Sequence, residues 1–398
     1  MPTSTLVKKL KKLSFSLTTI TALGLATSQS AEAASFYSIS DLGTLGGTES
    51  MAYGINNLGQ VVGQSQTASG AKRAFLWTDG VGMSDLGHFG SNGSYATSIN
   101  DSGQVSGTSG LFPDSRGEAR AFRYTDGVGK VNLGVLPPNG GDSRGNDINA
   151  SGQVVGWANR GHGFGYPESN DNPGYAVRWT GSSIQSLGTL GGYYSVGTGI
   201  NDNGQVTGYS ATARNAATHA FLWTEGVGMT DLGTLGGKNS YASKINNSGQ
   251  VVGKSQTANG DERAFLWNES DGMTDLGTLG GKNSYAWGIN KFGLVVGNSD
   301  DANESSRAFL WENDVMTDLN SLIATDSGWE LKQARDINDL GQIVGWGSIN
   351  GKTHAFLLTP VSEHKSVPEP SSTLGLLAFG TFGVASLLKR KQQEKVLN

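Results

Sequence analysis

Two aspartates at one repeated position are the residues of this 398-residue chain best placed for acid–base chemistry. Asp147 and Asp336 each stand directly before an isoleucine of a recurring segment, where a repeat fold would bring them to a common central channel. Two carboxylates there could serve as the acid and the base of a secreted glycan-active hydrolase. Glycine fills the same position at Gly54, Gly199 and Gly288, which makes the pair a weak catalytic signature.

The histidines show neither the spacing of a metal site nor that of a nucleophilic triad. None is spaced His-x-His or His-x-x-x-His, and the five are His88, His162, His219, His354 and His364. A Gly-x-Ser-x-Gly elbow is also absent. The sequence therefore predicts no catalytic residue, no metal and no cofactor. We expect a binding or structural module, and the hydrolase is the alternative.

Residues suited to binding gather in two insertions that break the repeat, at 110–118 and 160–173. Long loops on a regular scaffold commonly carry binding sites. We predict a ligand-facing patch with aromatic faces for a sugar or a peptide, made of Phe112, Arg116, His162, Phe164, Tyr166 and Asp171. Sequence drift without a binding role is the alternative.

The elements that must position these residues form a repeat. The segment Ile-Asn-x-x-Gly-Gln-Val-Val-Gly recurs seven times with variations, and a phrase such as Arg-Ala-Phe-Leu-Trp at 73–77 follows each copy. The isoleucines are Ile55, Ile99, Ile148, Ile200, Ile245, Ile289 and Ile337. Their spacing of 44 to 52 residues indicates a solenoid, a propeller or another array.

Each unit divides into four short segments rich in β-branched or aromatic residues. In the fifth unit we predict strands at 241–246, 250–255, 262–267 and 272–277. Asn246-Asn247-Ser248-Gly249 predicts a type I turn closed by a glycine with positive φ. Calcium binding by these turns is an alternative, but Ala150 and Lys291 stand where ligands would be needed. Gly-Thr-Leu-Gly-Gly segments between units, such as 43–47, are expected to be turns.

Seven units of four strands predict an all-β, seven-bladed β-propeller. The seventh unit supplies only three strands, and residues 37–43 resemble the missing fourth, so an N-terminal strand should close the ring. A β-solenoid is the alternative fold, but it would have atypical capping repeats. One set of large side chains is expected to pack between blades, namely Trp77, Trp179, Trp223, Trp267 and Trp311.

The two ends differ from the repeats. Residues 1–33 have the parts of a signal peptide, with lysines at 8–12, an apolar stretch and a cleavage site at Ala31 and Ala33. The propeller is assigned to 34–362 and a sorting tail to 363–398. Within the tail, 371–388 carries no charge and is followed by Lys389-Arg390-Lys391, which predicts a transmembrane helix with its basic end in the cytoplasm.

This tail resembles the PEP-CTERM sorting signal, with Pro368, Glu369 and Pro370 in the place of the motif. The resemblance implies an exosortase-type processing enzyme as a partner, contact with the inner membrane before processing, and delivery to the cell surface or extracellular matrix. A permanent membrane anchor is the alternative.

The repeats resemble those of the bacterial HAF-repeat family of extracellular proteins, because His219-Ala220-Phe221 and His354-Ala355-Phe356 match its name. This resemblance implies export and a repeat architecture but no established activity.

Charge narrows the range of partners. Without both tails the chain keeps 21 basic and 31 acidic residues, a net charge of about −10. So acidic a domain is a poor nucleic-acid binder, and we predict a matrix polysaccharide or a surface protein as the partner. The chain has no cysteine, so its own packing must hold the exported domain together.

Overall fold

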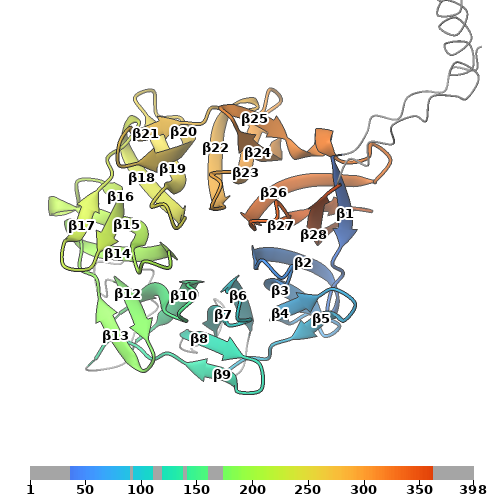
Figure 1. Cartoon of the computed structure of the whole chain (residues 1–398), viewed down its shortest axis with the longest axis horizontal. Helices are drawn as coiled ribbons and strands as arrows, with labels where there is room; N and C mark the ends of the chain where they lie inside the picture. Colours follow the sequence, from blue (N-terminus) through green and yellow to red (C-terminus); the bar gives the residue numbers. More distant parts are fainter. Residues whose placement is uncertain (1–35, 90–92, 111–118, 138–140, 160–173, 362–398) are drawn as a thin grey trace, which may run out of the picture. The chain divides into compact units, whose positions relative to one another are not determined.

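The computed structural model describes residues 36–89, 93–110, 119–137, 141–159 and 174–361. These residues form seven antiparallel sheets of four strands, arranged as blades around a central channel (Figure 1). The predicted seven-bladed β-propeller is confirmed. Within the described ranges no helix is long and apolar enough to cross a membrane, and the predicted span 371–388 lies outside them. The signal peptide at 1–33 lies outside them too.

The strands follow one another outward from the channel in each blade. Blades one to three contain β2 (Gly46–Ile55), β3 (Val61–Thr67), β4 (Lys72–Thr78) and β5 (Gly82–Asp85); β6 (Ser94–Ile99), β7 (Val105–Ser109), β8 (Arg120–Thr125) and β9 (Gly129–Asn132); and β10 (Ser143–Ile148), β11 (Val154–Ala158), β12 (Tyr175–Thr180) and β13 (Ser183–Ser186). Blades four to six contain β14 (Gly191–Ile200), β15 (Val206–Thr212), β16 (Thr218–Thr224) and β17 (Gly228–Asp231); β18 (Gly236–Ile245), β19 (Val251–Thr257), β20 (Glu262–Asn268) and β21 (Gly272–Asp275); and β22 (Gly280–Ile289), β23 (Val295–Asp301), β24 (Ser306–Glu312) and β25 (Val315–Asp318). Blade seven contains β26 (Trp329–Ile337), β27 (Ile343–Ile349), β28 (Lys352–Pro360) and, from the other end of the chain, β1 (Tyr37–Asp41).

The N-terminal strand closes the ring as predicted. β1 pairs with β28, and Asp41 lies opposite Phe356, as Asp231 lies opposite Phe221 in blade four. His354 Nδ1 lies 2.8 Å from the Asp41 carboxylate, and His219 makes the same 2.8 Å contact with Asp231. The N-terminal strand therefore occupies the outer position of blade seven in the register that the outer strand has elsewhere.

The innermost strands are longer than expected. We predicted turns for segments such as 43–47, but Gly46 and Gly47 already belong to β2, and Leu45 forms a bridge with Thr67. The predicted turn was therefore wrong for the second half of this segment, Leu45 to Gly47. Two adjacent glycines suggest a turn, but here they allow a close approach, since a Cβ on Gly47 would lie 2.7 Å from the Gln66 side chain.

A bulge in each innermost strand decides which side chains face the channel. In β2, Ala52 pairs with Gly63 and Gly54 with Val62, so Tyr53 is an extra residue without a partner of its own. The facing glycine is required by space, because a Cβ on Gly63 would lie 2.0 Å from the Met51 carbonyl oxygen. Six other blades repeat this close approach, at Gly107, Gly156, Gly208, Gly253, Gly297 and Gly345.

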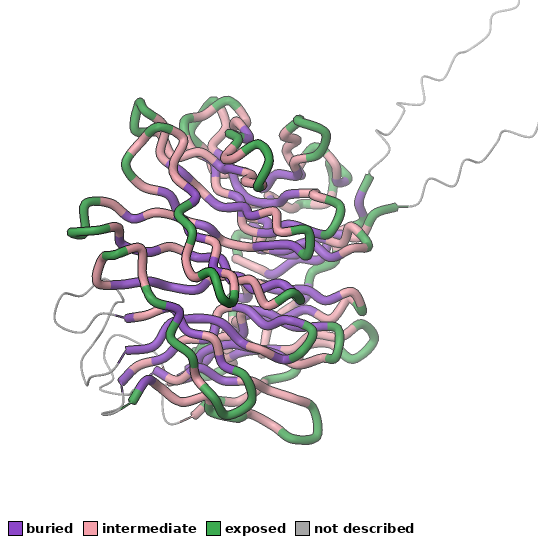
Figure 2. The backbone as a smooth tube through the Cα atoms, turned by 60° about the vertical axis from the view of Figure 1, so that its left-hand side comes forward, coloured by how far each residue is buried: buried purple, intermediate pink, exposed green. Residues whose placement is uncertain are grey.

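Apolar side chains fill the space between neighbouring blades, so that buried residues follow the strands and exposed ones the loops (Figure 2). Trp179 of blade three is 1% exposed and packs in one cluster with Ala121 and Leu136 of blade two. The other four recurring tryptophans also pack against such clusters, namely Trp77, Trp223, Trp267 and Trp311. The prediction that these side chains belong to the core is confirmed.

A closed ring of side-chain hydrogen bonds joins the seven blades at one end of the channel. The first asparagine of each turn donates from Nδ2 to the backbone carbonyl of its counterpart in the next blade, at 2.9–3.2 Å. We call these residues the Asn ring: Asn56, Asn100, Asn149, Asn201, Asn246, Asn290 and Asn338. The predicted type I turn is also confirmed, since Gly249 has φ +79° and its N–H donates to the Asn246 carbonyl.

Replacing Asn246 with Ala should lower the free energy of unfolding by about 2–3 kcal/mol, because the side chain is buried and its partners would lose their bonds. Besides the bond to Asn290, Asn246 donates to Gln250 Oε1 at 2.8 Å and accepts from the N–H groups of Ser248 and Gln250. Urea unfolding measures the change. The matched control is Gln250→Leu, since blade six carries Leu294 at this position, and it should cost less than about 1 kcal/mol. Equal losses in the two variants would contradict the assignment.

Candidate functional site: the central channel

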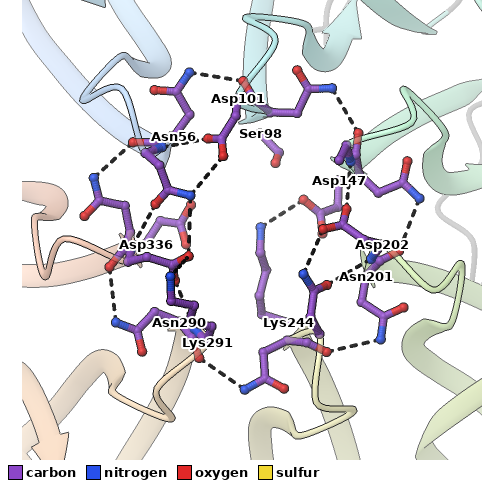
Figure 3. A pocket seen from close by; sticks show the side chains of 18 of the residues that line it. Asn56, Ser98, Asp101, Asp147, Asn201, Asp202, Lys244, Asn290, Lys291 and Asp336 are labelled. Atoms are coloured by element: carbon purple, nitrogen blue, oxygen red, sulfur yellow. Dashed lines mark hydrogen bonds and ion pairs between the residues drawn. The ribbon is translucent and has the colours of Figure 1, made fainter.

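The channel holds a cavity at each end, and the direction of the innermost strands distinguishes them. These strands run from the loops between blades to the Asn ring. A cavity of about 190 Å³ lies among their last residues and the turns, and we call this the narrow end (Figure 3). A cavity of about 800 Å³ is lined by the middle of the innermost strands and by the second strands. We call it the funnel. It opens at the end where the loops between blades lie.

Asp147 and Asp336, the two carboxylates of the alternative hydrolase, lie at the waist between these cavities. The Lys244 side chain reaches across to Asp147, with its Nζ 2.9 Å from Asp147 Oδ1 (Figure 3). The other Asp147 oxygen accepts from the Ile200 N–H at 2.9 Å. Asp336 accepts from the N–H groups of Ile55 and Ile337 at 3.2 and 3.1 Å. Each carboxylate thus joins its own blade to the next one.

Electrostatics keep the waist charged. Burial by itself would lower the pKa of Lys244, but the charges of Asp147 and Asp336 and the hydrogen bond to Asp147 outweigh it, so that the pKa lies above its ordinary value. Burial raises the pKa of Asp336, against the charge of Lys244 and the hydrogen bond from Ile55. Lys244 is therefore a cation at neutral pH and the counter-ion of the waist.

The rim of the narrow end uses its acidic residues as acceptors. Asp101 accepts from the Asn57 N–H at 2.8 Å, and Asp202 accepts from the Ala150 N–H at 2.8 Å. Asp339 accepts from the Lys291 N–H at 3.1 Å. These contacts between blades account for the acidic residues that suggested calcium in the sequence.

All seven blades contribute to the funnel, and its lining is aromatic and basic. It includes eight aromatic side chains, namely Tyr53, Tyr95, Trp157, Tyr209, Tyr241, Tyr285, Trp287 and Trp346. Basic residues in the lining are Arg144, Lys244, Lys254 and Arg335, and the acidic lining residue is Asp336. This combination of aromatic faces and a few polar groups in a concave site is typical of ligand pockets.

Hydrogen bonds fix part of the funnel wall in one arrangement. Trp346 Nε1 donates to Gln333 Oε1 at 2.8 Å, and Gln333 Nε2 donates to Asn298 Oδ1 at 3.0 Å. Trp287 Nε1 donates to the same Asn298 oxygen at 2.7 Å. Tyr285 and Trp287 are stacked, with ring centroids 6.3 Å apart. The wall of blades six and seven is therefore ordered before a ligand arrives.

The predicted loop patch cannot be placed. Phe112, Arg116, His162, Phe164, Tyr166 and Asp171 all lie outside the described residues. So do Ala31, Ala33, Pro368, Glu369 and Pro370. Each insertion follows the second strand of its blade. These strands end at Ser109 and Ala158, which lie at the same end of the blades as the funnel mouth.

Sequence reasoning missed the funnel residues. They stand two or four positions before the isoleucine of each repeat, or directly after the glycine of the second strand, and aromatic residues recur at all three positions. This recurrence was an available signal.

The fold and the channel define a class, a seven-bladed β-propeller with a ligand-sized central funnel. The chain also carries a PEP-CTERM protein-sorting motif, whose family model matches residues 366–391. This motif indicates export with membrane-associated sorting and implies processing by an exosortase-type enzyme. A model described as "Protein of unknown function (DUF3466)" matches residues 169–279. No curated protein matches the chain, and the resemblance to HAF repeats stays a prediction.

Several solved propellers are distantly similar. The β-propeller domain of the Trilobed protease from Pyrococcus furiosus has 9% identity and a TM-score of 0.47, covering 67% of this chain and 82% of that one. A gluconolactonase from Xanthomonas campestris has 9% identity and a TM-score of 0.41, covering 82% and 90%. The BP39L lectin from Burkholderia pseudomallei has the same identity and TM-score, covering 82% and 98%. Similarity at this level carries no argument about function.

Proposed function

We propose that this chain is an exported module of the cell surface or extracellular matrix, which binds a saccharide of a matrix polymer in the funnel. The observation that carries the proposal is the preorganised, aromatic-lined cavity of about 800 Å³. That volume has room for about two or three sugar rings. The PEP-CTERM motif supports delivery to the place where such polymers lie.

Two aromatic rings are best placed to stack on a sugar. Tyr95 of blade two and Trp346 of blade seven line the funnel. Among the described residues, neither ring is covered by another ring or by a cation. The electron-rich face of such a ring attracts the C–H groups on the flat side of a pyranose. The side-chain amide of Gln333 lies next to Trp346 and can order the hydroxyl groups.

Replacing Tyr95 and Trp346 together with Ala should weaken retention of the secreted chain on polysaccharide from its host by about tenfold or more. Binding is measured by sedimentation with the polymer, and thermal unfolding checks the fold. Phe292→Ala is the matched control, because Phe292 is 68% exposed beside the narrow end. Phe164→Ala with Tyr166→Ala tests the predicted loop patch. A loss confined to this loop variant would move the site to the loops, and unchanged retention of the funnel variant would overturn the proposal.

A secreted glycan hydrolase is the second candidate, favoured by the raised pKa of Asp336 beside the Asp147 carboxylate. Both carboxylates are bound to backbone N–H groups, which supports a structural role instead. The same polysaccharide separates the two candidates. A hydrolase would release reducing ends in a reaction that Asp147→Asn abolishes, whereas a binding module retains the polymer intact.

A further inference from the structure

We infer that the funnel selects a carboxylate-bearing sugar, a uronate unit of an acidic polysaccharide, through the guanidinium groups of Arg144 and Arg335. The inference rests on the proposed function, because it names the ligand class of the same site.

Aromatic faces hold the two guanidinium groups in the funnel without neutralising them. The Arg335 guanidinium carbon lies 4.2 Å from the ring centre of Trp287 and 5.4 Å from that of Tyr53. The guanidinium carbon of Arg144 lies 5.4 Å from the ring centre of Trp157. A cation over a ring is fixed in position while its N–H donors at the edge stay available for an acceptor.

The other cations of the funnel already have counter-ions. Lys254 Nζ lies 3.0 Å from the Glu262 carboxylate, and Lys244 is bound to Asp147. In the described part of the chain, by contrast, no hydrogen bond or ion pair of Arg144 or Arg335 is found, and the buried Nε of Arg144 has no acceptor. A buried donor without a partner costs free energy, which an anionic ligand would recover.

The remaining carboxyl group of the lining does not cancel these charges. Both Asp336 oxygens accept backbone N–H groups, and one carboxylate cannot balance two guanidinium groups. The funnel is thus a positive cavity in a domain whose net charge is about −10. The negative net charge repels an anion from the molecule as a whole, whereas the basic lining of the funnel attracts it.

The position of the arginines favours a uronate oligomer over a small free anion. Arg144 lies on β10 and Arg335 on β26, across the channel from each other (Figure 1). Successive rings of an acidic polysaccharide each carry a carboxylate and can meet both sides. Tyr95 and Trp346 offer the stacking faces that a sugar uses and that phosphate or sulfate does not.

The test uses calorimetric titration of the full secreted chain with trimers of glucuronate, galacturonate and mannuronate, and with the carboxyl-reduced counterpart of each. We expect at least one uronate trimer to bind about tenfold or more tightly than its reduced form, with an affinity that falls as salt rises. Arg144→Gln and Arg335→Gln should each abolish this preference, and Arg144→Lys should keep part of it. Lys352→Gln is the matched control, because it removes the same charge from an exposed site. Thermal unfolding verifies the fold of each variant.

Three results would overturn the inference: equal binding of uronate and reduced trimers, no binding of any uronate trimer, or equal affinity for sodium sulfate. None of them decides the proposed function, which depends on retention of the host polymer and its loss in the Tyr95 and Trp346 variant. If that retention fails while the uronate preference holds, the funnel is a uronate site without a matrix role.

Discussion

Replacing Lys244 with Met should lower the free energy of unfolding by about 3–5 kcal/mol, the usual cost of removing one partner from a buried ion pair. Asp147 is 2% exposed and would keep only its bond from the Ile200 N–H. Urea unfolding of the purified chain measures the change. Asp147→Asn in the same chain should restore much of the loss, because an amide needs no counter-ion. A loss below about 1 kcal/mol, or no recovery in the double variant, would contradict the role of Lys244 as counter-ion.

The pH dependence of this loss follows from the pKa shifts. The Lys244 pKa is raised in the folded chain, so its stabilising effect is fully present below the ordinary lysine pKa of about 10.4 and is lost as the pH rises through the folded value. The deficit of Lys244→Met should also shrink as the pH falls through the raised pKa of Asp336, since a protonated carboxyl needs no cation. Unfolding curves between pH 4 and about pH 11 test both directions.

Removing the N-terminal strand should have the second large effect. A chain that lacks residues 36–42 loses β1, and we expect a loss of about 5 kcal/mol or more, because Tyr37 and Leu42 are buried and the edge of β28 would be left bare. A peptide of residues 36–43 added to the shortened chain should raise the melting temperature progressively, with the logarithm of its concentration once binding is saturated. A scrambled peptide is the control. If the shortened chain melts like the complete one, β1 does not hold the ring closed.

The repeat could be predicted from the sequence because each blade uses the same local rules. The Asn-x-x-Gly turn, the Asp of the outer strand and the split seventh unit all follow from residue types at fixed spacing. Even the pairing of residues 37–43 with the strand around Phe356 was recoverable, because Asp41 and Leu42 repeat the outer-strand pattern.

The funnel could not be predicted from simple alternation of side chains. A regular strand would place Arg335 and Asp336 on opposite faces, but the bulge turns both toward the channel. Both line the funnel, and Asp336 also lines the cavity at the narrow end. The pairing of Lys244 with Asp147, which lie 97 residues apart, depends on the curvature of the ring. Neither effect can be deduced from the sequence of a single repeat.

The two ends of the propeller leave it on the side away from the funnel mouth. Tyr37 lies opposite Pro360, whose ring is close to Gly341 of the seventh asparagine turn, so Phe36 and Val361 are neighbours at the narrow end. Pro368 stands seven positions after Val361, a reach of about 25 Å at full extension. A chain held by the proposed membrane tail would therefore be attached through its narrow end, and the funnel mouth would be the end farther from the point of attachment. The proposed binding site would then be accessible before any cleavage of the tail, and cleavage would change the location of the protein while leaving the funnel unchanged.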